Sequence, residues 1–182
     1  MNMSGERLIA APRADVWAAL NDPEVLKACI PGCDSLEKTS DTSFSAVATQ
    51  KVGPVKATFK GDVSLSEIVE GQGYTITGEG KGGAAGFAKG GAKVALSDAA
   101  PPEGKSGPAT LLTYEAEAKV GGKLAQLGSR LIDGFAKKMA DDFFNRFQTA
   151  VEGPAEPEAA AADGGNDAPE GKKKSWLKRL IS

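Results

Sequence analysis

Residues 55–65 read VKATFKGDVSL, and this stretch decides the fold. Apolar or small residues occupy every odd position from Val55 to Leu65, while lysine, threonine, aspartate and serine occupy the even positions. Alternation with a period of two is typical of a β-strand that has one buried face and one face in water. We therefore expect a long strand here, with Val55, Phe59 and Leu65 turned toward a core.

The same alternation recurs on both sides of this stretch. It predicts strands at 5–10, 33–40, 43–52, 55–69, 73–81, 87–97 and 109–120. Gly53-Pro54 and the run from Glu70 to Gly73 supply turn residues, and 97–108 forms a longer loop. Two short helices are expected between the first two strands, at 13–20 and 23–28, where Pro12 and Pro23 suit a helix start.

A single long helix is predicted at 123–151. Large apolar residues recur there at steps of three or four, as on one face of an α-helix: Leu124, Leu127, Leu131, Phe135, Met139, Phe143 and Phe147. A curved antiparallel sheet wrapped around this helix would bury both apolar surfaces. The expected fold class is therefore α+β, with the helix gripped by the sheet.

The inward face of the expected sheet has few large side chains, because about half of its positions are glycine or alanine. Two interpretations remain open: small residues allow the helix to pack closely, or they leave an apolar cavity for a lipophilic ligand. We favour the cavity, in which Tyr74, Tyr114 and Gln50 would be the polar anchors. Its expected lining is Gln50, Phe59, Tyr74, Gly78, Gly90, Tyr114, Leu131, Phe135 and Met139.

The composition argues against several function classes. The chain contains no histidine, which removes the commonest general base and metal ligand, so we expect no catalysis and no metal. Residues 78–83 match G-x-G-x-x-G, but no amphipathic helix follows, so we expect no dinucleotide. The polar start and the lack of a long apolar stretch predict a cytoplasmic protein. The charges are nearly balanced through residue 152, so no nucleic-acid partner is expected.

Cys29 and Cys33 are separated by Ile30, Pro31 and Gly32. Two interpretations are open for this pair: apolar packing at a corner between a helix and a strand, or a pair that responds to redox conditions. The segment from Leu26 to Cys33, LKACIPGC, resembles the signature of the CoxG family of carbon monoxide dehydrogenase proteins. Residues 11–23, 53–61 and 78–94 are also similar to that family, and the first of these is similar to START-like (SRPBCC) domains generally.

This resemblance, which covers residues 1–152, implies a START-like helix-grip fold with a cavity between sheet and helix. It also implies a non-catalytic accessory protein of a carbon monoxide dehydrogenase or related molybdenum hydroxylase. Such an enzyme passes electrons into respiration, so menaquinone or ubiquinone is the expected cargo. A membrane-recruitment adaptor without a ligand, and an enzyme of the cyclase or hydrolase type found in some START-like proteins, are the alternatives.

The charges separate sharply at the end of the chain. Residues 153–171 are rich in alanine, proline, glycine and acid, which predicts a disordered linker. Residues 172–182 are basic and would place their apolar side chains on one helical face, as in a helix lying on a membrane. The membrane-binding residues would be Lys172, Lys173, Lys174, Trp176, Leu177, Lys178, Arg179, Leu180 and Ile181. A disordered basic tail that binds nucleic acid or aids solubility is the alternative.

Overall fold

A computed structural model describes residues 1–153 of the chain. It contains seven strands: β1 (Asn2–Ile9), β2 (Cys33–Ser40), β3 (Ser43–Val52), β4 (Val55–Val69), β5 (Gly73–Lys81), β6 (Phe87–Ala99) and β7 (Ala109–Gly121). The helices are α1 (Arg13–Leu20), α2 (Pro23–Cys29) and α3 (Ser129–Glu152), with 3-10 turns η1 (Gly83–Ala85) and η2 (Gly122–Leu127). All the predicted strands are present, and the predicted segment 172–182 and nearly all of the linker lie outside the described residues.

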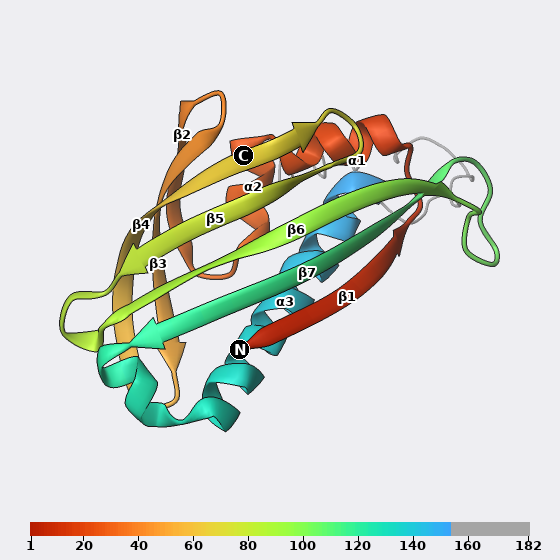
Figure 1. The fold of residues 1–182 in the computed structure, drawn as a ribbon. Helices are drawn as coiled ribbons and strands as arrows, with labels where there is room; N and C mark the ends of the chain where they lie inside the picture. The colour runs from red at the N-terminus through yellow and green to blue at the C-terminus, as the bar shows by residue number, and fades with distance from the viewer. Residues whose placement is uncertain (154–182) are drawn as a thin grey trace, which may run out of the picture.

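The strands form one antiparallel sheet in the order β1-β7-β6-β5-β4-β3-β2. From β2 to β7 the chain runs as a meander, because each strand pairs with the next one in the sequence. The helices α1 and α2 connect β1 to β2, which are the two edges of the sheet. Figure 1 shows the curved sheet in front of α3, which crosses behind it. The predicted α+β helix-grip architecture is confirmed.

The start of the long helix differs from the prediction. The helix α3 begins at Ser129, and the preceding residues form the 3-10 turn η2 instead of its first turns. Gly128 separates the two elements with a φ of +93°, a conformation that other residues rarely adopt. Leu124 is therefore buried from η2 and not from the helix.

The core lies under one half of the sheet, around the second half of α3. Phe147 is fully buried there, together with Ile9, Val16, Leu20, Leu112 and other apolar residues from α1 and the sheet. The ring of Phe143 stacks on that of Phe147 with 5.7 Å between their centroids. The first half of α3 is packed less completely, since Leu131 is 38 % exposed. The helix is thus seated firmly on the sheet at its C-terminal end only.

Candidate ligand cavity

An apolar cavity of about 460 Å³ lies between the sheet and the first half of α3. Its walls come from β3, β4, β6, β7, η2 and α3, with the N-terminus and the segment after α2 closing the sides. The lining consists of Met1, Met3, Ile30, Pro31, Gln50, Val52, Phe59, Ala88, Ala116, Glu117, Ala118, Val120, Leu124, Ile132, Phe135, Ala136, Met139, Ala140 and Phe143. Its volume falls within the usual range of small-molecule pockets.

The helical wall of the cavity follows from the spacing of residues on α3. Phe135, Met139 and Phe143 project at steps of four, and Ala136 and Ala140 fill the neighbouring row on the same face. The opposing wall is formed by small residues of β6 and β7, namely Ala88, Ala116 and Ala118. Small side chains therefore face the helix where it stands away from the sheet, and unoccupied volume results.

Gln50 provides the amide group among the lining side chains. Its Nε2 donates a hydrogen bond of 2.8 Å to the carbonyl oxygen of Pro31, which fixes the amide against the cavity wall. A primary amide carries two N–H donors and a carbonyl acceptor. Among residues 1–153, the second N–H and the Oε1 of Gln50 have no hydrogen-bond partner. One donor and one acceptor are thus left for a bound molecule.

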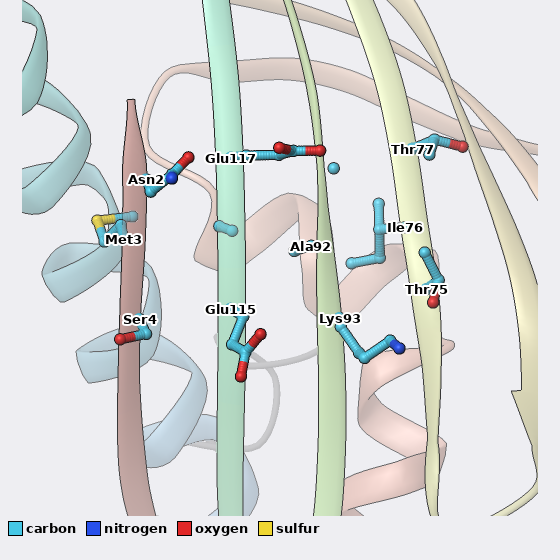
Figure 2. Close-up of a pocket in the computed structure, with 12 residues that line it drawn as sticks. Asn2, Met3, Ser4, Thr75, Ile76, Thr77, Ala92, Lys93, Glu115 and Glu117 are labelled. Carbon is cyan, nitrogen blue, oxygen red and sulfur yellow. The ribbon is translucent and has the colours of Figure 1, made fainter.

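Glu117 is the residue of the lining with a titratable side chain, and its carboxylate points away from the cavity. Its neighbours Ala116 and Ala118 face the helix, so the alternation of β7 places the side chain of Glu117 on the outer face. Figure 2 shows Glu117 there with Glu115, Lys93 and Thr77, around a polar hollow of about 600 Å³ over β1, β7, β6 and β5. The cavity interior therefore receives no ionised side chain.

The segment between the two cysteines forms part of the cavity wall. Ile30 and Pro31 line the cavity, and Gly32, with a φ of +75°, lies directly against β3. A Cβ atom on Gly32 would lie 2.3 Å from the carbonyl oxygen of Thr49, whose N–H donates to Gly32 O at 2.9 Å. A larger residue cannot occupy this position without moving the corner away from β3.

Both cysteine thiols are free and remain protonated at neutral pH. Burial raises the pKa of the Cys29 thiol to about 11, although the positive charge of Arg146 opposes the shift. Burial also raises the pKa of Cys33, whose Sγ donates to the carbonyl oxygen of Ser35 at 3.3 Å. Such thiols are poor nucleophiles. Packing at the corner explains Cys29 better than redox chemistry does.

Four of the nine residues predicted to line a cavity meet at this one: Gln50, Phe59, Phe135 and Met139. Tyr74 lies in the core instead, where its ring packs 5.3 Å from that of Trp17 and its hydroxyl donates to Leu20 O at 3.4 Å. Burial raises the pKa of Tyr74 well above its ordinary value. The tyrosine hydroxyl is therefore bound within the fold and does not reach a ligand.

The other four predicted residues also lie outside the cavity. Tyr114 stacks on Phe144 with 5.0 Å between the ring centroids. Leu131 lies over Gly53 at the tip of the β3–β4 hairpin. Gly78 and Gly90 allow close approach between strands, since a Cβ atom on Gly90 would lie 2.2 Å from the carbonyl oxygen of Glu117. A side chain at Gly90 would therefore disturb the sheet and not fill the cavity.

The glycine-rich run at 78–83 lies at the end of β5 and in the turn to β6. The 3-10 turn η1 and then β6 follow it, so the run has no helix N-terminus to receive a phosphate. Among residues 1–153, no group of three or more histidine, cysteine, aspartate or glutamate side chains is placed to hold a metal ion. Nor does this part of the chain contain a helix long and apolar enough to cross a bilayer.

A curved sheet around a long helix, with a cavity between them, defines a START-like helix-grip protein. Residues 5–152 match the family of carbon monoxide dehydrogenase CoxG proteins. The chain belongs to this family. No curated protein matches the chain.

Solved structures agree with this assignment. A conserved protein from Geobacillus kaustophilus is 30 % identical, with a TM-score of 0.73 over 83 % of this chain and 95 % of that one. A START superfamily protein from Mycobacterium smegmatis is 14 % identical, with a TM-score of 0.58 over 83 % and 97 %. The ZhuI aromatase/cyclase from Streptomyces sp. R1128 is 13 % identical, with a TM-score of 0.55 over 91 % and 99 %. The family and the fold indicate an accessory, ligand-binding role.

Proposed function

We propose that this protein binds a membrane quinone, menaquinone or ubiquinone, and carries it for a carbon monoxide dehydrogenase or a related molybdenum hydroxylase at the membrane surface. The apolar cavity under the first half of α3, with the single amide of Gln50 on its wall, is the observation that carries this proposal. A dehydrogenase of this kind delivers electrons to a lipid-soluble acceptor, and an accessory protein with an apolar cavity can hold that acceptor outside the bilayer.

The chemistry of the wall suits a quinone in both of its redox states. The unpaired N–H of Gln50 can donate to a quinone carbonyl, and its Oε1 can accept from a quinol hydroxyl. Phe59, Phe135 and Phe143 offer aromatic faces and edges to a quinone ring. The apolar remainder suits an isoprenoid chain, whose transfer from water is favourable by about 0.8 kcal/mol per buried CH₂ group.

The same walls support binding in preference to catalysis. A START-like fold also serves the ZhuI aromatase/cyclase. Acid–base chemistry requires a titratable group within reach of the substrate, and no such side chain points into this cavity from residues 1–153. We therefore propose a carrier that performs no reaction of its own.

Attachment to the membrane is assigned to residues 172–182. Their sequence combines Trp176, Leu177, Leu180 and Ile181 with lysine and arginine, which is the composition of a helix that lies on an anionic bilayer. Deleting 172–182 should abolish flotation of the full chain with vesicles of phosphatidylcholine and phosphatidylglycerol. Retention of full binding by the deletion variant would show that this segment is not the anchor.

The cargo is tested by extraction after expression in a quinone-containing host. Native mass spectrometry should find the chain with one bound quinone, and Ala136→Phe, which fills the cavity from α3, should lose it. Ala18→Phe is the matched control, because Ala18 is exposed on α1 and does not belong to the lining. A wild-type chain that carries no lipophilic molecule, or an Ala136→Phe variant that retains it, would rule out the carrier and leave a membrane adaptor.

A further inference from the structure

Lysines directly opposite one another mark one end of the sheet. The register pairs Lys51 with Lys56, Lys60 with Lys81, and Lys89 with Lys119. Residues paired in this way have Cβ atoms about 5 Å apart, and like charges at such positions destabilise a sheet. All six lysines are exposed. We call these three pairs the lysine pairs.

Few acidic side chains neutralise this end of the molecule. The segments 46–61, 80–97 and 118–132 contain no aspartate or glutamate, although the chain as a whole has a net charge of −2. Glu79 faces Lys89 from β5 and Asp62 faces Glu79, so acidic residues do meet the third pair. The other two pairs have no acidic residue opposite them, and Lys123 and Arg130 add further positive charge on η2 and α3.

Exposed apolar side chains lie at the same end. Phe87 and Leu131 are each 38 % exposed, which is unusual for such large side chains in this structure. Phe87 is the register partner of Lys81, and Leu131 covers Gly53 between Lys51 and Lys56. Figure 1 shows the β3–β4 hairpin, η1, η2 and the start of α3 gathered at this end, and η1 contacts both η2 and β4.

The cavity opens toward this end as well. Val52, Phe59, Val120, Leu124 and Ile132 belong to the hairpin, to the strand ends and to the elements gathered here, and all of them line it. The molecule thus combines uncompensated positive charge, isolated large apolar side chains and the lipophilic cavity in one region.

We infer that this end of the folded domain, bearing the lysine pairs with Phe87 and Leu131, docks directly on an anionic lipid bilayer. The inference rests on the proposed membrane association and adds a second contact to the C-terminal segment. Lysine heads meet the negative leaflet, and scattered apolar side chains enter the interfacial region. Retaining three repulsive pairs within one small region is explained by such a surface, because an anionic leaflet offsets the repulsion.

A triple variant of the full chain, Lys56→Gln, Lys81→Gln and Lys119→Gln, removes one member of each lysine pair. Each lysine beside an anionic leaflet is worth about fivefold in affinity, so we expect at least roughly a tenfold weaker binding to vesicles containing phosphatidylglycerol. Removing the repulsion should leave the urea midpoint at or above the wild-type value. The matched control is Lys27→Gln, Lys38→Gln and Lys93→Gln, which makes the same change in net charge at exposed sites elsewhere.

Hydrogen–deuterium exchange of the wild-type chain on the same vesicles locates the contact. Protection at 51–60, 81–89 and 119–131, present with phosphatidylglycerol and absent with phosphatidylcholine alone, is the expected result. Protection confined to 172–182, together with equal binding by the two triple variants, would overturn the inference and leave these lysines to an acidic protein partner. A wild-type chain that binds no vesicle would defeat the proposed membrane association itself, which is a different outcome.

Discussion

Gln50 and Pro31 are joined across the cavity wall by a hydrogen bond of 2.8 Å from the side-chain amide to the backbone carbonyl. This bond ties β3 to the corner that follows α2, so one side chain both supports the wall and presents polar atoms to the interior. The CIPGC signature and the cavity are thereby parts of one structure, a connection that the spacing of the cysteines alone does not reveal.

Replacing Gln50 by leucine should separate these two roles. The variant keeps a similar volume but leaves the Pro31 carbonyl oxygen without its donor, which should lower the free energy of unfolding by about 1 kcal/mol. Quinone retained through purification should fall several-fold, because the cavity then offers no donor or acceptor. Urea unfolding and extraction measure the two effects. Gln72→Leu, at an exposed turn, is the control, and unchanged quinone content in Gln50→Leu would contradict the assigned contact.

Two phenylalanines on α3 should differ sharply in their contribution to stability. Phe147→Ala should cost about 3–5 kcal/mol, because Phe147 is fully buried in the core. Phe135→Ala should cost less than half as much, since Phe135 faces the cavity and loses fewer contacts. Chemical denaturation of the ligand-free chain measures both values. Equal losses would mean that the helix is packed against the sheet along its whole length.

Glu152 should make stability depend on acid. Partial burial raises its pKa, but hydrogen bonds from the N–H of Ala10 (2.8 Å) and from Gln148, with the charge of Lys105, outweigh burial and lower it overall. The stabilisation is therefore present above the unfolded-state pKa near 4.5 and is lost as the pH falls through the lower folded value.

The Glu152→Gln variant tests this dependence. At neutral pH it should be less stable than wild type by about 1 kcal/mol, and the gap should close as the pH drops below about 4. Urea midpoints across the pH range provide the measurement. Glu70→Gln, at an exposed turn, should show no comparable gap, and a pH-independent gap for Glu152→Gln would refute the role of the charge.

The cysteines should react with a thiol reagent in two well-separated phases. Cys33 is partly exposed and should react slowly in the native protein, while Cys29 is buried with a pKa of about 11 and should react only after unfolding. Absorbance at neutral pH, with and without denaturant, counts the two thiols. Cys33→Ser should abolish the native phase. Rapid reaction of both cysteines in the native chain would indicate an exposed and reactive pair.

Strands were predictable from the sequence because alternation reports directly on which side of a sheet each residue occupies. Alternation does not report the distance along a strand, so Tyr74 and Phe59 both read as inward although one lies in the core and the other at the cavity. The helical period in turn assigned Leu124 to α3, because it carries no information on the break that the positive φ of Gly128 imposes.

Which part of the cavity wall each segment forms was beyond the reach of periodicity. Pro31 and Met3 come from the opposite ends of a helical connection, and only the closed fold brings them to the same hollow. A signal for the helical wall was present, since Ala136 and Ala140 follow the phase of Phe135 and Met139. That signal indicates a face, and the uneven seating of the helix decides that the face borders free volume.

The seating of α3, firm at Phe147 and loose around Phe135, assigns cohesion and cargo to different halves of one helix. Substitutions in its first three turns can reshape the binding volume while the anchoring half preserves the fold. Evolution can therefore refit this scaffold to a new lipophilic molecule by small steps, without first having to gain stability elsewhere.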